Sequence, residues 1–288
     1  RSVNKETGKA AYYPQCNNLW TNGCHRKLKD GISCKDCKSR SYKTITKLII
    51  LNHLRGNSYN ACDVIGVYPI FGNGTCRFMV FDFDNHDKGA EENDFANVDD
   101  TWIEEVEAMR EICVLNGIDP LVERSRSGRG AHVWIFFDKP IAASLVRKFG
   151  FALLDKGAEQ VNLKSFKYYD RMLPAQDSLS DNSSLGNLIA LPLQGKALQD
   201  GNSAFIDGNW NAYPDQWRIL FSKPRLSQEF LEEKIKEWTN SMDDIAANAD
   251  ESDREKPWNR MQHFNKNDVD GKIHITLSNG IYVDSTNL

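Results

Sequence analysis

An apolar run that ends in two acids, CRFMVFDFD at residues 76–84, constrains the fold of this chain more than any other segment. Successive side chains of an extended strand alternate between its two faces, so Asp82 and Asp84 would share one face. Met79 and Phe81 would then lie on the opposite face, within the core. Because like charges held side by side repel each other, the pattern predicts a core strand whose last residues serve something other than folding.

The remaining periodicity predicts a mixed α and β protein. Helices are expected at residues 44–56, 97–117, 141–161 and 226–242. Strands are expected at residues 64–70, 76–84, 187–193 and 203–207, and on both sides of the Gly-rich turn within residues 120–138. The turn FGNGT indicates that the first two of these strands pair as a hairpin. Residues 241–259 read as an acidic linker, and residues 271–284 as a second hairpin with Asn279-Gly280 at its turn.

The charge of the chain is unevenly distributed. Its formal net charge is −4, yet residues 1–48 hold eleven Lys and Arg against three Asp and Glu. A basic block on an acidic body is typical of a polyanion-binding module, with a solvated basic arm as the alternative. No apolar stretch approaches the roughly 18 residues of a membrane span, and residues 1–15 lack the apolar centre of a signal peptide. We therefore expect a cytoplasmic protein without membrane contact, and the opening at Arg1 indicates a piece of a longer polypeptide.

Four of the seven cysteines lie within 22 residues, at Cys16, Cys24, Cys34 and Cys37. The final Cys-x-x-Cys pair is typical of a knuckle that aims two thiolates at one tetrahedral ion, and two upstream cysteines complete a four-thiolate set. His25 competes with Cys24 as a ligand. Four unrelated thiols are the alternative, and a redox Cys-x-x-Cys would leave two cysteines unexplained. We favour structural zinc, because so polar a segment needs metal binding to fold.

Two carboxylates on one face of an apolar strand suit a divalent cation, since Mg²⁺ binds one or two protein carboxylates together with substrate phosphate oxygens. The motif D-x-D is weak alone, because solvated acids on an edge strand give the same pattern. The following segment SRSGRGAHVWIFF adds a second signal. Its glycines let backbone N–H groups approach an anion, with Ser127, Arg129 and His132 as phosphate ligands. A Gly-rich hairpin followed by a core histidine is the alternative.

A third carboxylate, Asp207, ends a short apolar strand in NSAFID much as Asp82 does. We expect it to converge on the acidic pair, although an aspartate before glycine is more often part of a turn. Arg171 in YYDRMLP and Lys196 in LPLQGK are further candidate phosphate ligands.

Taken together, these motifs resemble those of the archaeo-eukaryotic primase, or primase-polymerase, superfamily. The matching residues are Asp82-Phe83-Asp84, then Gly130-Ala131-His132, then Ile206-Asp207. Ser125 and Ser127 precede the second motif, and either of them suits the nucleotide. The resemblance covers roughly residues 12–225 and is nearest to the primase-polymerases of CRISPR-associated and helicase-linked conflict systems, which carry an upstream four-cysteine module.

The resemblance implies an α+β fold, namely an RRM-like antiparallel sheet with an added α/β module. It places a zinc-binding module at residues 1–42 and a catalytic domain at residues 43–225. Residues 226–288 would form a C-terminal helix, an acidic linker and a short hairpin.

The implied function is that of a DNA-dependent primase-polymerase, which transfers nucleotides from nucleoside triphosphates on a single-stranded DNA template. The implied metal ligands are Asp82, Asp84 and Asp207 for two Mg²⁺ or Mn²⁺ ions, and Cys16, Cys24, Cys34 and Cys37 for Zn²⁺. Ser127, Arg129, His132, Arg171 and Lys196 would bind the triphosphate. A metal-dependent nuclease and a non-catalytic zinc-dependent nucleic-acid-binding module are the alternatives.

Overall fold

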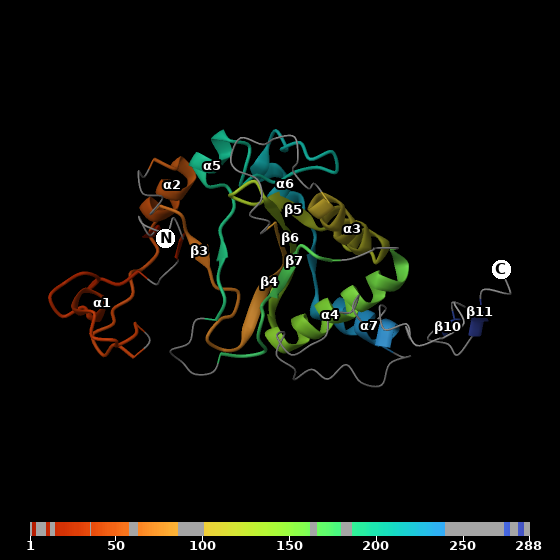
Figure 1. The fold of residues 1–288 in the computed structure, drawn as a ribbon, viewed down its shortest axis with the longest axis horizontal. Coiled ribbons are helices and arrows are strands. Elements are labelled where there is room, and N and C mark those ends of the chain that lie inside the picture. The colour runs from red at the N-terminus through yellow and green to blue at the C-terminus, as the bar shows by residue number, and fades with distance from the viewer. Residues whose placement is uncertain are drawn as a thin grey trace.

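The computed structural model describes residues 2–3, 10–11, 15–34, 36–57, 63–85, 101–161, 166–179, 186–239, 274–276 and 282–284. Over these ranges the chain is α+β, with one principal sheet and helices on both of its sides (Figure 1). The expected linker at residues 241–259 lies outside the described residues. None of the described helices is long and apolar enough to cross a membrane.

The acidic strand is central in the principal sheet. Strand β4 (Thr75–Asp84) pairs with β6 (Gly130–Ala142) on one side and with β7 (Tyr169–Leu173) on the other, both antiparallel. Strand β5 (Leu121–Arg124) pairs with β6 in the predicted hairpin, and β9 (Arg225–Leu226) runs parallel to the middle of β6. Because both edges of β4 are paired, its terminal acids are not the solvated acids of an edge strand.

One face of β4 lies in the larger of two cores. Met79, Phe81 and Phe83 are fully buried there, as the alternation in the sequence predicted for the first two. Helices α3 (Thr101–Leu115), α4 (Ala143–Gln160) and α7 (Gln228–Thr239) cover this face (Figure 1). The buried side chains of α7 belong to the same core as those of α3 and α4. Helix α7 is therefore packed into the body that carries β4.

The opposite face of β4 carries the acids and a smaller core that includes Val80 and Trp134. A second layer covers this core, with β3 (Gly66–Val67), β8 (Ile189–Ala190), α5 (Gly195–Gln199) and α6 (Gln216–Ser222). The predicted hairpin between β3 and β4 is wrong, because β3 pairs with β8 instead. A turn does form at residues 71–75, but β6 and β7 already occupy both edges of β4, so β3 has no edge of β4 on which to pair.

Helix α2 (Lys47–Arg55) is fastened to this second layer at its C-terminal end. The side chain of Thr46 caps its first turn, and Gly56 ends it in the left-handed region at φ 65°. A Cβ on Gly56 would lie 2.0 Å from the backbone nitrogen of Lys196, so only glycine permits this approach to α5. The buried ring of His53 hydrogen-bonds the Pro192 carbonyl oxygen (2.9 Å) and accepts the Ile65 N–H (3.2 Å). The close approach at Gly56 and the two hydrogen bonds of His53 together hold α2 against the second layer.

Short elements complete the described chain: β1 (Ser2–Val3), β2 (Ala10–Ala11), α1 (His25–Leu28), β10 (His274–Thr276) and β11 (Tyr282–Asp284). Strands β10 and β11 pair antiparallel as the C-terminal pattern predicted, and the turn residues between them lie outside the described residues.

Candidate active site

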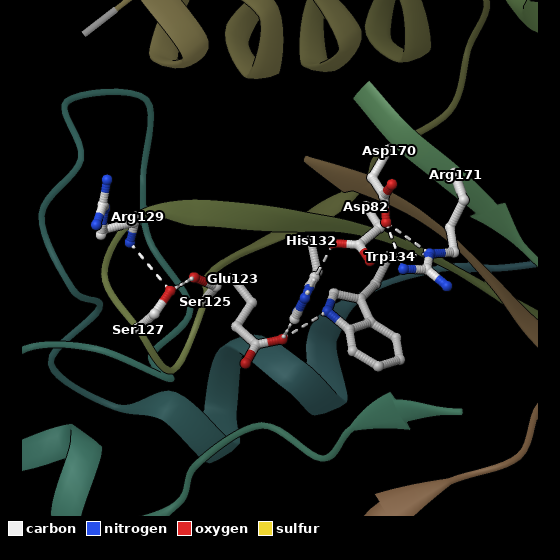
Figure 2. A network of polar contacts seen from close by, with 9 residues as sticks. All are labelled: Asp82, Glu123, Ser125, Ser127, Arg129, His132, Trp134, Asp170 and Arg171. Atoms are coloured by element: carbon white, nitrogen blue, oxygen red, sulfur yellow. Dashed lines mark hydrogen bonds and ion pairs between the residues drawn. The ribbon is translucent and has the colours of Figure 1, made fainter. Parts of the chain in front are cut away.

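A single row across the sheet holds most of the charged residues of the site. Asp82 on β4 lies opposite His132 on β6 and opposite Arg171 on β7. The Nε2 atom of His132 is 3.4 Å from Oδ1 of Asp82, and Nε of Arg171 is 3.7 Å from Oδ2 (Figure 2). The side chain of Asp82 is 19% exposed, so its carboxylate is partly desolvated and still reachable. The fold thus brings together three of the residues that the sequence singled out.

A buried carboxylate that sequence reasoning missed orients the histidine. Glu123 on β5 is 1% exposed and lies opposite His132 in the same row. One oxygen of Glu123 is 2.8 Å from Nδ1 of His132 and accepts the indole N–H of Trp134 at 2.9 Å. Glu123 thereby fixes the ring so that Nε2 points toward Asp82 (Figure 2). A glutamate within an apolar strand gives little signal in the sequence, because only the strand pairing shows its partner.

These contacts decide the charge of the histidine. Burial works to lower the pKa of His132, but the charge of Glu123 and the hydrogen bonds that the ring donates to Asp82 and Glu123 outweigh it and raise the pKa to about 10. At neutral pH the ring is therefore an imidazolium, which can donate a hydrogen bond to an anion from Nε2.

A β-bulge on β7 places a further acid, Asp170, on the strand next to Asp82. Asp82 and Phe83 are neighbours on β4, yet they pair with Arg171 and Tyr169, so Asp170 is the extra residue. Asp170 binds the Arg171 guanidinium, with Oδ2 2.7 Å from Nε. The guanidinium thus contacts the carboxylates of both Asp82 and Asp170 (Figure 2). The sequence signal was present, since an apolar-Asp motif occurs in YYDR as well as in NSAFID.

Helix α3 fastens the start of this bulged strand. Glu105 is 4% exposed, and its carboxylate accepts the backbone N–H groups of Lys167 (2.6 Å) and Tyr168 (2.8 Å). The carbonyl of Tyr168 in turn accepts the N–H of Asp84 at 2.9 Å. One buried side chain thus sets where β7 begins relative to the acids of β4.

The structure does not bring Asp207 to the acidic pair, which corrects the expected convergence. Phe205 bridges to Glu123 on β5, so this segment lies three strand spacings, roughly 14 Å, from β4. The Asp207 carboxylate instead accepts the N–H groups of Asn209 and Asn211, both at 2.9 Å. Asp207 therefore closes a turn, which is the alternative that the sequence left open.

The turn between β5 and β6 carries Ser127 and Arg129, both exposed. The hydroxyl of Ser127 accepts the N–H of Arg129 (3.3 Å) and lies 3.0 Å from the hydroxyl of Ser125. Gly128 adopts φ 76°, and a Cβ on Gly130 would lie 2.2 Å from a carbonyl oxygen of β4. The two glycines thus form a tight turn that presents both serines and the arginine at the end of the site (Figure 2).

Lys196 lies farther out than the other predicted ligands. It is exposed on α5, where its backbone packs against the end of α2. Over the ranges that the structure describes, Lys196 forms no ion pair with the acids of the site.

The four N-terminal cysteines line one pocket, together with His25 and Arg26. Backbone N–H groups surround two of the four sulfur atoms. The N–H groups of Asn18 (3.4 Å) and Ser41 (3.3 Å) point at Cys16 Sγ, and backbone N–H groups from residues 20 and 27 lower the pKa of Cys24. This donor set suits zinc. In the described residues, however, no three His, Cys, Asp or Glu side chains are gathered closely enough to hold an ion, either here or at the acids.

Comparison with protein families gives one match. Residues 1–234 match the family described as "TOTE conflict system, Archaeo-Eukaryotic Primase domain". A search of curated proteins found no match.

Proposed function

The chain belongs to the Archaeo-Eukaryotic Primase domain family of TOTE conflict systems, and on this basis we propose that it is a DNA-dependent primase-polymerase. At the family level this means primase-polymerase-like nucleotidyl transfer, with nucleic acid and nucleoside triphosphates as ligands. The specific proposal is transfer of nucleotides onto a growing strand on a single-stranded DNA template, including the start of new primers. The observation that supports it best is the row in which Asp82 faces the cations His132 and Arg171.

We assign the metal-binding carboxylates to Asp82, Asp84 and Asp170, with Asp170 in place of Asp207. The first two lie on one face of β4, and Asp170 shares the Arg171 guanidinium with Asp82 across the bulge, whereas Asp207 is engaged in a turn. Carboxylate oxygens are the ligands that Mg²⁺ and Mn²⁺ prefer. When bound, two such ions would lower the pKa of the attacking 3′-hydroxyl and stabilise the leaving pyrophosphate.

The cations of the site are proposed to bind the triphosphate. His132 can donate from Nε2 because Glu123 holds the other ring nitrogen. Arg129 and the hydroxyl of Ser127 would bind phosphate oxygens at the turn, with Lys196 as a peripheral contact. Arg171 now compensates the charges of Asp82 and Asp170, and we propose that it turns to the triphosphate when substrate is bound.

The N-terminal cysteines are proposed to hold a structural zinc ion, and the basic segment around them to bind the template or the 5′ triphosphate of a new primer. The hydrogen bonds to Cys16 and Cys24 support a thiolate site. We further propose that the chain acts within a larger conflict system. Its association with a CRISPR system stays a prediction.

The test is incubation of the chain with a single-stranded DNA template, Mg²⁺ or Mn²⁺ and labelled nucleoside triphosphates. New labelled oligonucleotides that disappear with Asp82→Ala and Asp84→Ala support synthesis. Shortening of the template would instead identify a nuclease. Template binding without either product would identify a non-catalytic nucleic-acid-binding module, and both of these outcomes reject the proposal.

A further inference from the structure

Two large aromatic rings on α6 face solvent together. Trp217 and Phe221 are one helical turn apart, and 48% and 74% of their surfaces are exposed. Their ring centroids are 6.2 Å apart with an interplanar angle of 26°, so the rings are stacked. Neither ring contributes to the two cores of the described chain. Stacked rings left in water point to a flat apolar partner.

The helix that carries these rings is firmly held on the acid-bearing side of the sheet. Asp215 caps its first turn, and the amide side chain of Gln216 bonds both the N–H (2.6 Å) and the carbonyl (3.0 Å) of Phe205. Ile219 and Leu220 pack on the core that also contains Val80 and Trp134. Phe205 belongs to the same row as Asp82, and α6 accordingly lies beside β5 (Figure 1). The rings therefore occupy a rigid site near the catalytic face.

The segment that carries the rings is basic, with one acid, Asp215, at the N-cap of its helix. Residues 216–226 contain Arg218, Lys223 and Arg225 and no acid, in a chain whose net charge is −4. Lys223 is bound to Asp119 at 2.5 Å. Arg218 is exposed between the two rings in sequence, and the described residues offer its side chain no ion-pair partner. Aromatic faces combined with cations are the features by which proteins bind single strands without reading their sequence.

We propose that Trp217 and Phe221 stack on unpaired bases of single-stranded DNA, while Arg218 contacts the adjacent phosphate. This site lies outside the row of acids and cations, and it rests on the proposed function because that function requires a single-stranded template. The occupant is a single strand rather than a duplex, since paired bases do not present their faces to a ring.

The first test measures binding of a fluorescent oligothymidine strand to the full chain by anisotropy. Trp217→Ala and Phe221→Ala should each weaken binding between about 5-fold and about 150-fold, and Trp217→Phe should restore most of the loss. Phe71→Ala is the matched control, because Phe71 is also an exposed aromatic (44%) but lies in the turn before β4, where its N–H bonds the carbonyl of Thr75, and Thr75 is roughly 23 Å along β4 from Asp82. It should bind as the wild type does. Equal binding by all variants overturns the proposal.

A second strand of equal length that lacks bases separates stacking from charge. On this abasic strand Trp217→Ala should bind like the wild type, whereas Arg218→Gln should still weaken binding. Arg218→Gln should also reduce the slope of log affinity against log salt by about 0.7. If Trp217→Ala loses equal affinity for both strands, the ring does not stack on bases and supports binding only by maintaining the fold, and the proposal is overturned.

Measuring DNA synthesis alongside strand binding distinguishes failure of the stacking site from failure of the proposed function. If Asp82→Ala abolishes synthesis while the ring variants bind normally, the stacking site is rejected and the primase-polymerase assignment stands. If no variant and no wild-type protein synthesises DNA but the ring variants still lose binding, the stacking site stands without that assignment. A shift in oligomeric state on size-exclusion chromatography, with binding unchanged, would identify a protein interface and reject the site.

Discussion

Replacing Glu105 with alanine should release the start of β7 from α3. The carboxylate is buried and accepts two backbone N–H groups, at 2.6 and 2.8 Å. Hydrogen bonds to charged groups contribute about 1.5–3 kcal/mol each, so we expect the free energy of unfolding to fall by about 3–6 kcal/mol. Glu105→Gln keeps one carbonyl acceptor and should cost about half as much. Nucleotide incorporation should fall with both variants, because Tyr168 also receives the N–H of Asp84.

The assay is urea denaturation with linear extrapolation, combined with incorporation measured where each variant is folded. Glu111→Ala is the matched control, since Glu111 is an exposed acid on the same helix and should change stability by no more than about 0.5 kcal/mol. If Glu105→Ala costs less than about 1 kcal/mol, or no more than the control, the two hydrogen bonds do not anchor the strand and the reasoning fails.

Three further outcomes are expected. Asp170→Asn should abolish nucleotide incorporation and Asp207→Asn should largely preserve it. The reverse result would restore Asp207 as the third metal ligand. In metal-free protein, the raised pKa of His132 should add stability below pH 6.5 that is lost as the pH rises toward 10, so the difference in unfolding free energy between wild type and His132→Gln should shrink over that window. A flat difference would contradict the ion pairs with Asp82 and Glu123. Metal analysis should find about one zinc per chain, lost when Cys34 and Cys37 are both replaced. Protein without zinc would refute the four-thiolate site.

Much of the sheet could be predicted because its strands carry strong local patterns. The alternation in residues 76–84 separates the buried Met79 and Phe81 from the acids, and the Gly-rich turn marks the hairpin of β5 and β6. The helices α2, α3, α4 and α7 follow their periodicity to within a few residues. In each case the determining interactions lie close together in the chain.

The sequence misled or gave no signal where the structure depends on contacts between segments far apart in the chain. An apolar residue precedes Asp at both residues 169–170 and residues 206–207, and only the strand order shows that the first of these is adjacent to β4. The partner of β3 is likewise set by competition for strand edges rather than by its turn. Glu105 and Glu123 are isolated buried acids whose partners lie on other elements.

The bulge at Asp170 makes the site sensitive to the length of β7 as well as to its side chains. Tyr169 and Arg171 both pair with residues of β4, and Asp170 between them is the extra residue of the bulge. Deleting this one codon would leave a regular strand that pairs normally and keeps its apolar face, yet lacks the third carboxylate. A deletion scan should therefore find here a position where the protein stays folded and soluble while its chemistry is lost, and related chains that omit the residue would be recognisable from spacing alone as inactive copies.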